Sequence, residues 1–313
     1  MPDEKMKIAL AGIGEIARQQ HIPALRNSSD WQLAAAISRN ATVDGASNHK
    51  DIDAFLNDRG DIEAISLALP PGPRFDYAVK AIEAGLHVMI EKPPAVTLAQ
   101  CHLLRDLADR TDATFFVSWH SRMGRAIDEA RRRLKGARLD RLRIDWREDV
   151  NQFHPGQDWI FEAGNLGVFD PGINAMSILT AILDRPAFVS SSDLYFPKGR
   201  EAPIAADLRF DNGTGAEMTA KFDWRHDGEA RWDIEFETDR GNFRLVCSGS
   251  YIEADGQRIG DGMTDEYPLL YALFADLVRQ GRSETDFSPM IQVADAFLLG
   301  RRHEVAAFDW RKD

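Results

Sequence analysis

Short apolar runs alternate with amphipathic segments through the first 120 residues of the chain. The apolar runs, each of strand length, cover residues 7–11, 33–37, 64–68, 87–90 and 114–117. Segments with the spacing of an amphipathic helix lie at residues 15–26, 52–56, 74–84 and 98–109. Apolar strands that alternate with helices are typical of βαβ units, whose parallel sheet is buried on both faces. Residues 1–120 are therefore predicted to form an α/β domain with a doubly wound parallel sheet.

The pattern changes after residue 120. A strand is predicted at 141–150, and helices are predicted at 122–134, 171–183, 266–280 and 289–305. Between residues 187 and 254, strand-like segments are separated by turn sequences such as DNGTG, HDGE and DRGN, which indicates an antiparallel meander. Residues 121–313 are therefore predicted to form an α+β domain with mostly antiparallel strands. The last helix is compatible with packing on either domain.

The balance of charge limits the partners of the chain. It has 50 acidic and 38 basic side chains, which gives a net charge of −12. Such a charge repels nucleic acids and anionic membrane surfaces, so we expect neither as a partner. Any phosphate-binding site must then be local rather than a broad basic face.

The sequence lacks the patterns typical of membrane-spanning segments, signal peptides and metal sites. No run approaches the roughly 20 apolar residues that span a bilayer, and the N-terminus has no signal-peptide pattern. Cys101 and Cys247 have no CxxC partner, and the histidines show neither HxH nor HExxH spacing. We therefore expect a cytoplasmic protein that binds no metal.

A glycine motif follows the first predicted strand. The segment Gly12-Ile13-Gly14-Glu15-Ile16-Ala17 matches the pattern G-x-G-x-x-G/A at the start of the first helix. Gly12 permits a tight turn, Gly14 lets a pyrophosphate approach the backbone, and Ala17 lets the helix pack on the strand. The helix N-terminus offers N–H groups to an anion. We therefore expect a Rossmann-type dinucleotide site that includes Glu15 and Ile16, the alternative being a glycine turn without a ligand.

The end of the second strand bears on the choice of cofactor. NAD sites usually place Asp or Glu about 20 residues after the glycine motif, whereas this chain has Ser38 and Arg39 there. A hydroxyl and a guanidinium suit the 2′-phosphate of NADP. NADP is the expected cofactor and NAD stays possible, because an arginine at a strand end is also common as solvated surface.

Residues after three other strands complete the expected cofactor site. Glu91-Lys92-Pro93-Pro94 follows the fourth strand, and the carboxyl ends of parallel strands face the cofactor. Lys92 is expected near the nicotinamide, although a surface ion pair before two prolines would have the same sequence. Pro70, Glu91 and Trp119 are the other candidates for cofactor contact at these strand ends.

Together these motifs resemble a known family. GIGEIA, EKPP and GVFDPGIN make the chain resemble the glucose–fructose oxidoreductase and inositol dehydrogenase family over essentially its whole length. SWHSR (118–122), WREDV (146–150), residues 153–174 and FDWRH (222–226) resemble its bacterial aldose 1-dehydrogenases, which act on L-arabinose or D-galactose. The resemblance implies a Rossmann domain followed by an α+β substrate-binding domain with an open, mostly antiparallel sheet.

The resemblance also implies catalytic residues. Lys92 corresponds to the active-site lysine of the family. The peptide bond that follows this lysine is often cis in the family, so the resemblance implies a cis bond between Lys92 and Pro93. Many members carry Asp-x-x-x-His on a helix of the substrate domain, but here these positions are Asp170 and Asn174. An asparagine cannot act as a base, so the resemblance implies that Asp170 takes the proton. The spacing alone favours a helix cap instead, because Asp followed by Pro is typical of the N-cap and first position of a helix.

Further polar and aromatic residues are candidates for sugar binding. Polar side chains that bond sugar hydroxyls give specificity, and aromatic rings stack on the apolar face of a pyranose. These candidates are Asn174, Glu148, His154, His120, Trp232 and Phe153. The plainer alternatives are a surface charge for Glu148, a turn at His154-Pro155 and a core position for His120.

The expected activity is NAD(P)-dependent oxidation of C1 of a free sugar to an aldonolactone, with L-arabinose, D-galactose or D-fucose as substrate. The alternatives are a dehydrogenase of a cyclitol or of a sugar phosphate, or a protein that senses NADP without catalysis. The open sheet of the second domain is expected to allow a homo-oligomer.

Overall fold

The computed structural model describes residues 4–260 and 265–311, which fold as two compact units. The first unit extends to His120 and also includes Asp265–Phe287. The second unit comprises the other described residues. The chain thus returns to the first unit after the second has begun. The segment 265–287, which the sequence predicts as part of the second domain, belongs to the first unit.

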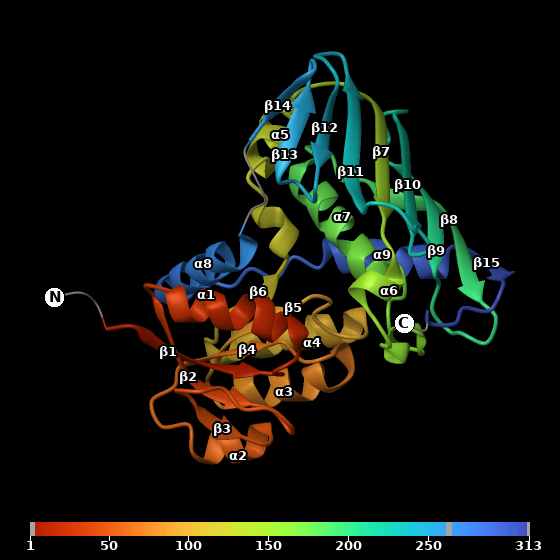
Figure 1. Cartoon of the computed structure of the whole chain (residues 1–313). Coiled ribbons are helices and arrows are strands. Elements are labelled where there is room, and N and C mark those ends of the chain that lie inside the picture. The colour runs from red at the N-terminus through yellow and green to blue at the C-terminus, as the bar shows by residue number, and fades with distance from the viewer. Residues whose placement is uncertain (1–3, 261–264, 312–313) are drawn as a thin grey trace. The chain divides into compact units, whose positions relative to one another are not determined.

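The first unit is built on a six-stranded parallel sheet (Figure 1). Its strands are β1 (Met6–Ala11), β2 (Trp31–Ile37), β3 (Ser47–His49), β4 (Ala64–Leu67), β5 (His87–Glu91) and β6 (Phe115–Ser118). The order β3-β2-β1-β4-β5-β6 reverses direction between β1 and β4, which is the switch point of a doubly wound sheet. The predicted Rossmann fold is confirmed. The sequence did not predict β3, whose three residues carry no apolar side chain.

Helices flank this sheet. They are a π-helical turn (Ala17–His21) continued by α1 (Ile22–Asn27), then α2 (Ile52–Asn57), α3 (Pro71–Glu83), α4 (Leu98–Thr111) and α8 (Glu266–Gln280). Helix α8 belongs to this unit because its apolar face is buried there. The ring of Phe274 stacks on Trp31 with the centroids 5.2 Å apart, and Trp31 Nε1 donates to the carbonyl of Tyr271 at 2.8 Å.

The second unit contains a nine-stranded sheet in the order β14-β13-β12-β11-β7-β10-β9-β8-β15. Its strands are β7 (Leu139–Arg147), β8 (Phe188–Pro197), β9 (Ala205–Asp211), β10 (Glu217–Asp223), β11 (Arg231–Thr238), β12 (Phe243–Val246), β13 (Tyr251–Ala254), β14 (Gln257–Ile259) and β15 (Gly300–Val305). Only the pairs β7–β10 and β8–β15 are parallel, which confirms the predicted, mostly antiparallel open sheet. The expected meander is interrupted, because β7 lies between β10 and β11.

One predicted helix is wrong in its second half. Helix α9 (Ser288–Leu298) ends well before residue 305, and β15 follows it as an edge strand. A Cβ at Gly300 would lie 2.9 Å from the backbone carbonyl oxygen of Ala296 and 2.6 Å from Leu194 Cδ1, so glycine eases the passage from α9 into β15 beside β8. The Asp193 carboxylate on β8 binds Arg301 and His303, which fixes the register of the edge strand.

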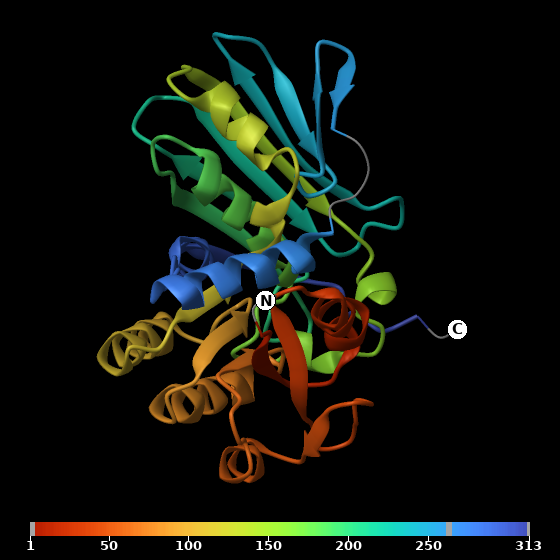
Figure 2. The same cartoon turned by 90° about the vertical axis from the view of Figure 1, so that its left-hand side faces the viewer.

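Helices α5 (Ile127–Leu134), α7 (Phe169–Ile182) and α9 lie on one face of the nine-stranded sheet (Figure 2). On β7, Leu142, Ile144 and Trp146 are buried, whereas Arg141 and Arg143 are exposed. This alternation leaves the other face of the sheet covered with charged side chains. The predicted helix 122–134 begins only at Ile127, after a 3₁₀ turn. Within the described residues, no helix is both long and apolar enough to cross a membrane.

Candidate functional site

The turn after β1 has the geometry of a phosphate-binding loop. Gly12 has φ +89°, and a Cβ there would lie 2.6 Å from the backbone N of Leu69, so no other residue fits without strain. A Cβ at Gly14 would meet nothing within 4 Å. Ala17 is fully buried and packs in the apolar cluster beneath the turn. The turn is therefore fixed from below and open above Gly14, where a pyrophosphate fits.

The first helical turn presents its backbone outward. Glu15 and Ile16 are exposed and begin the helix, and the first N–H groups of a helix have no partner within it. Such groups, together with the helix dipole, attract anions. These residues fit a bound dinucleotide, as the sequence predicts.

Ser38 and Arg39 follow β2 directly. The backbone N–H of Ser38 donates to the His49 carbonyl at 2.9 Å, which joins the ends of β2 and β3. The Arg39 side chain is exposed and forms no ion pair within the described part of the chain. Its guanidinium is thus available to an anion at the end of β2.

The loop that carries Lys92 is held from beneath by Arg74. This guanidinium belongs to α3 and is buried, with 4% exposure. Its Nε donates to the Leu69 carbonyl at 2.8 Å, and a terminal nitrogen donates to the Glu91 carbonyl at 2.6 Å and to the carbonyl of Pro93. One side chain therefore links the ends of β4 and β5. Lys92 is half-buried, and the Lys92–Pro93 peptide is cis.

The Glu91 side chain is buried inside the first unit. Tyr267 of α8 donates to its Oε1 at 2.9 Å, and His21 Nε2 lies 3.3 Å from the same oxygen, close enough for an ion pair but outside hydrogen-bond geometry. Burial opposes ionisation of Glu91, but the attraction of His21 and His120 outweighs burial and lowers its pKa to about 2. Glu91 is therefore a carboxylate at any working pH, held by protein groups beside Lys92.

Trp119 and His120 follow β6. Trp119 is 3% exposed, and its Nε1 donates to the Asp286 carbonyl at 2.8 Å. His120 Nδ1 lies 2.5 Å from Glu266 Oε2, and its ring stacks on Tyr267 with the centroids 5.9 Å apart. Burial alone would lower the pKa of His120, but the Glu266 carboxylate outweighs burial and raises it. His120 therefore belongs to a charged pair rather than to an apolar core.

Pro70 occupies a separate position in this unit. It is exposed and directly precedes α3, at the end of the segment that continues β4. Its ring therefore remains accessible beside the strand end that Arg74 binds.

In the second unit, Glu148 follows β7 and is 4% exposed. Trp224 Nε1 donates to Glu148 Oε1 at 3.1 Å, and Trp232 Nε1 donates to Oε2 at 2.7 Å. Two indoles therefore fix the plane of the carboxylate. The alternative of a solvated surface charge at Glu148 is excluded by this burial.

Two aromatic contacts connect this carboxylate with the neighbouring segment. The ring of Phe153 meets Trp232 edge-on at 5.4 Å, and the His154 ring lies 5.3 Å from Trp224. His154 Nε2 is 3.6 Å from Asp170 Oδ2. Glu148, His154 and Asp170 thus belong to one polar cluster with an aromatic lining.

Asp170 and Asn174 lie in α7, one turn apart and half-buried among buried neighbours. The helix begins at Phe169, with Val168 at the N-cap and no capping side chain, so the alternative that Asp170 is the cap is wrong. Gly167, with φ +54°, lets the chain pass Pro203, whose carbonyl would lie 2.3 Å from a Cβ. The Asp170 carboxylate is therefore placed in the first turn, where the helix dipole favours its charge.

Some residues of these clusters were not predicted from the sequence. They are Trp224, which binds Glu148, together with Arg74, His21, Glu266 and Tyr267. Trp224 stands in the segment FDWRH, which supported the family resemblance without giving a role to the tryptophan. Glu266 and Tyr267 are distant in sequence from the strands they serve, so local pattern carries no signal for them.

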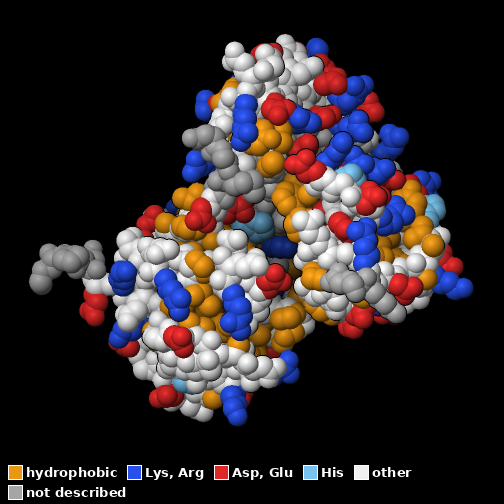
Figure 3. Space-filling model, in the orientation of Figure 1, with side chains coloured by type: hydrophobic (Ala, Val, Ile, Leu, Met, Phe, Trp, Pro, Cys, Tyr) orange, Lys and Arg blue, Asp and Glu red, His pale blue; other side chains and the backbone are white. Residues whose placement is uncertain are grey.

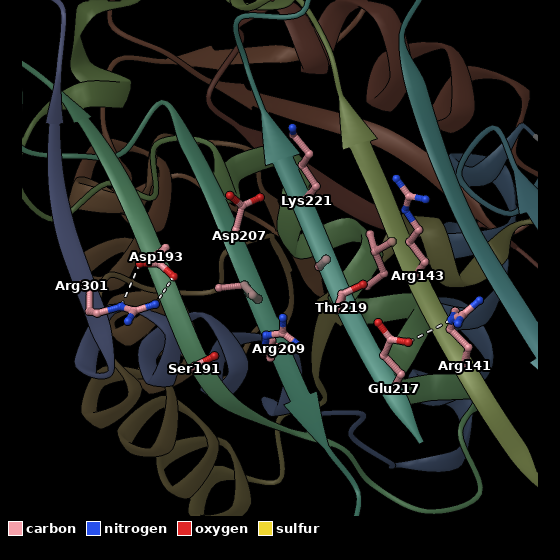
Figure 4. Close-up of a pocket in the computed structure, with 13 residues that line it drawn as sticks. Arg141, Arg143, Ser191, Asp193, Asp207, Arg209, Glu217, Thr219, Lys221 and Arg301 are labelled. Atoms are coloured by element: carbon pink, nitrogen blue, oxygen red, sulfur yellow. Dashed lines mark hydrogen bonds and ion pairs between the residues drawn. The ribbon is translucent and has the colours of Figure 1, made fainter. Parts of the chain in front are cut away.

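The uncovered face of the nine-stranded sheet is hollowed between β7 and β15 (Figure 4). The hollow measures about 530 Å³ and is lined by both signs of charge. Arg301 pairs with Asp193, and Arg141 pairs with Glu217, across neighbouring strands. On the face shown in Figure 3, basic and acidic side chains are interspersed in the same way. Across the described residues, no three His, Cys, Asp or Glu side chains gather as a metal site requires.

Comparisons with known proteins cover nearly the whole chain. Residues 6–119 match the model of an oxidoreductase family with an NAD-binding Rossmann fold. Galactose 1-dehydrogenase of Pseudomonas fluorescens is 35% identical over 305 residues, which are 97% of this chain and 99% of that protein.

Two solved structures extend the comparison. The crystal structure of a D-galactose-1-dehydrogenase protein from Rhizobium etli is 43% identical, with a TM-score of 0.94 over 97% of this chain and 98% of that one. A 3-ketoreductase from Actinomadura kijaniata, solved with NADP and TDP-benzene, has a TM-score of 0.84 at 17% identity, over 96% of this chain and 100% of that one. The second likeness concerns the fold alone.

Proposed function

Because this chain belongs to the glucose–fructose oxidoreductase and inositol dehydrogenase family of NAD-binding Rossmann-fold oxidoreductases, we propose that it oxidises C1 of a free aldose. It is an NAD(P)-dependent sugar dehydrogenase that acts on CH–OH groups. The proposal for C1 is carried by the end-to-end similarity to galactose 1-dehydrogenase, at 35% identity. A dehydrogenase needs a dinucleotide site and a sugar site; the first unit carries the candidates for the dinucleotide site, and the second unit carries most of the candidates for the sugar site.

In the proposed reaction, Asp170 takes the proton of the C1 hydroxyl as the C1–H bond breaks. Bound NAD(P)⁺ supplies the acceptor for the hydride that leaves C1. The two electrons of the O–H bond form the new C=O bond, so the product is an aldonolactone. Lys92 stabilises the negative charge that develops on the oxygen. The Asp170 carboxylate lies in the first turn of α7, with His154 Nε2 3.6 Å from its Oδ2, so both groups are placed to act on the same hydroxyl.

Recognition of the sugar is assigned to the polar and aromatic cluster of the second unit. Glu148, His154 and Asn174 are proposed to bond ring hydroxyls, with Trp232 and Phe153 packing on the apolar face of the ring. Glu148 is held by two indoles and His154 lies beside Asp170, and side chains fixed in this way make a sugar that lacks one hydroxyl a poor substrate. His120, in the first unit, is proposed to contact the substrate as well.

A neutral sugar suits the second unit better than a sugar phosphate. Arg147 directly precedes Glu148, and Arg225 directly follows Trp224, which binds Glu148. Arg147 is paired with Asp145, and Arg225 is bound by both oxygens of Asp223 at 2.9 Å. Both positive charges are therefore neutralised within the protein, which leaves little attraction for a phosphate.

The test is formation of NAD(P)H with a panel of free aldoses and inositols, with the lactone trapped as its hydroxamate. We expect turnover with L-arabinose, D-galactose or D-fucose, and trapping of one lactone per reduced cofactor. Failure with every pentose and hexose would contradict the proposal, and turnover with inositols alone would assign the chain to another polyol.

NADP is the proposed preferred cofactor, held by the glycine turn, the first helical turn and the strand ends. The exposed guanidinium of Arg39, next to the Ser38 hydroxyl, supports this preference because together they suit a 2′-phosphate. Pro70, Glu91, Lys92 and Trp119 complete the proposed cofactor-binding set.

Cytoplasmic location and self-association are further parts of the proposal. Both cysteines are free thiols, which suits a reducing compartment. The uncovered sheet face carries both signs of charge, so opposite charges of two copies can meet across a twofold axis. We propose a homodimer through this face.

A further inference from the structure

Helix α8 begins with two residues that reach the carboxyl ends of two neighbouring strands. Glu266 Oε2 lies 2.5 Å from Nδ1 of His120, just after β6. The hydroxyl of Tyr267, the next residue, donates to Glu91 Oε1 at 2.9 Å, at the end of β5. The start of one helix therefore binds Glu91, the residue before Lys92, and His120, the residue after Trp119.

These contacts are shielded from water. Tyr267 is 4% exposed and Glu91 is 5% exposed, and the side chains of His120 and Glu266 are 18% and 17% exposed. The Tyr267 ring also stacks on His120 at an interplanar angle of 20°. Hydrogen bonds in such surroundings are stronger and more directional than on the surface. The four side chains therefore restrict one another to a single arrangement.

The contact with Glu266 determines which nitrogen of the His120 ring carries a proton. A carboxylate only accepts hydrogen bonds, so Nδ1 of His120 must carry a proton. Nε2 is then an acceptor in the neutral ring and a donor in the cation. The charged and titratable groups around the ring are Glu266 and Tyr267 on α8, Glu91 on β5 and Lys92 after it.

We propose that Glu266 and Tyr267 are positioning residues of the dehydrogenase, which fix the tautomer of His120 and the orientation of Glu91 next to Lys92. This inference rests on the proposed function, in which His120 and Lys92 contact the substrate. Glu266 acts through His120, and Tyr267 acts through Glu91. Neither residue needs to touch the sugar or the cofactor.

The pairing itself is tested without turnover. His120 is titrated by NMR in the cofactor-bound enzyme labelled at histidine carbons, with its signal assigned by its loss in His120→Gln. In Glu266→Gln, we expect the His120 titration to move to lower pH, because the anion that favours the imidazolium is gone. An unchanged titration would overturn the role of Glu266.

Kinetics then test whether the pairing serves catalysis. We expect Glu266→Gln to lower kcat by about 10-fold or more and to move the His120-dependent limb of the pH profile to lower pH, with KM for the cofactor unchanged. Tyr267→Phe is expected to lower kcat without moving that limb. The matched control is Asp276→Asn on the exposed side of the same helix, where a neutralised carboxylate should leave kcat unchanged.

Two outcomes would overturn the proposal. One is a normal kcat in both Glu266→Gln and Tyr267→Phe, which would reduce the two residues to anchors of α8. The other is a loss of kcat that occurs only near the unfolding temperature of each variant and is absent when kcat is measured well below that temperature, because such a loss reflects unfolding alone. If the wild type oxidised no aldose, the proposed function would fail, and the NMR titration would still decide whether Glu266 controls His120.

Discussion

Asp170 shows how position makes a carboxylate suitable as a base. It lies in the first turn of α7, half-buried, with His154 3.6 Å away and buried apolar residues on both sides. A base must be charged at the working pH and close to the proton that it removes. Asp170 lies at the helix end where the dipole favours a carboxylate, and Asn174, one turn later, lies on the same helix face.

Replacement of this base gives the first prediction. Asp170→Asn keeps the shape of the side chain and removes its ability to take a proton. We expect kcat to fall at least about 100-fold, the usual scale for loss of a general base, while the Kd of NADP changes little. Steady-state rates and fluorescence titration of the cofactor measure both. A rate near normal would assign the aspartate a purely structural role.

Arg39 provides a second test at the same scale. Arg39→Ala removes the exposed guanidinium at the end of β2, and with it the proposed partner of the 2′-phosphate. NADP affinity should fall by about 10-fold or more, because one charged hydrogen bond contributes roughly 1.5–3 kcal/mol, while NAD affinity stays within a factor of two. Calorimetry with both cofactors makes the comparison, and equal losses would contradict the assignment.

Glu91 makes stability depend on pH. Its folded pKa of about 2 lies below its ordinary value of 4.5, so its stabilisation is complete above about pH 5 and is lost as the pH falls towards 2. The shift corresponds to about 3 kcal/mol in the free energy of unfolding. Urea unfolding of the wild type and of Glu91→Gln should therefore converge at low pH. A difference that is constant from pH 7 to 3 would contradict the shift.

At the scale of elements, the two glycines of the turn after β1 are expected to have different roles, Gly12 in folding and Gly14 in cofactor binding. Gly12→Ala forces a Cβ against the backbone of Leu69 at φ +89°, so we expect a loss of roughly 1–3 kcal/mol in the free energy of unfolding. Gly14→Ala meets only open space, so it should fold normally and bind NADP weakly. Urea unfolding and cofactor titration of the pair test this, and a stable, binding-competent Gly12→Ala would be inconsistent with the turn.

The hydrophobic pattern predicted those elements whose own residues are apolar at the spacing of a strand or helix. The parallel strands of the first unit are short apolar runs, and α8 was predicted with its observed bounds. β3 and β15 were missed because they carry polar residues and exist only through pairing with β2 and β8. The placement of β7 between β10 and β11 likewise depends on pairing across the chain.

The candidate sites divide in the same way. The sequence proposes Gly12, Gly14 and Lys92 because they stand at strand ends and turns, and the resemblance proposes Asp170. Neither proposes the groups that hold them. Tyr267 reaches Glu91, and Trp224 reaches Glu148, from positions more than 70 residues away in the chain. Hydrophobic periodicity contains no information on such pairings.

At the scale of the whole molecule, the uncovered sheet face leads to a prediction on mass in solution. If two copies pair through this face, the protein sediments at twice its chain mass. Thr219→Arg adds a cation beside Arg143 and Lys221 in the middle of the hollow, so we expect the dimer to dissociate at higher concentrations than in the wild type.

Sedimentation velocity over a range of concentrations measures this effect. Thr42→Arg, an equal change at an exposed loop of the first unit, is the control and should keep the dimer. A wild type that is monomeric, or a Thr219→Arg variant that associates normally, would remove the sheet face as the interface.

The two edges of the nine-stranded sheet protect the protein from uncontrolled polymerisation. β14 has only three residues, and β15 carries Arg301, Arg302, His303 and Glu304 in succession, all exposed. An unpaired strand edge is a template for fibrils, and short or charged edges resist the addition of further strands. The wide sheet therefore resists the addition of strands at both of its edges. Replacing the charges of β15 with valine would turn that barrier into a point of aggregation.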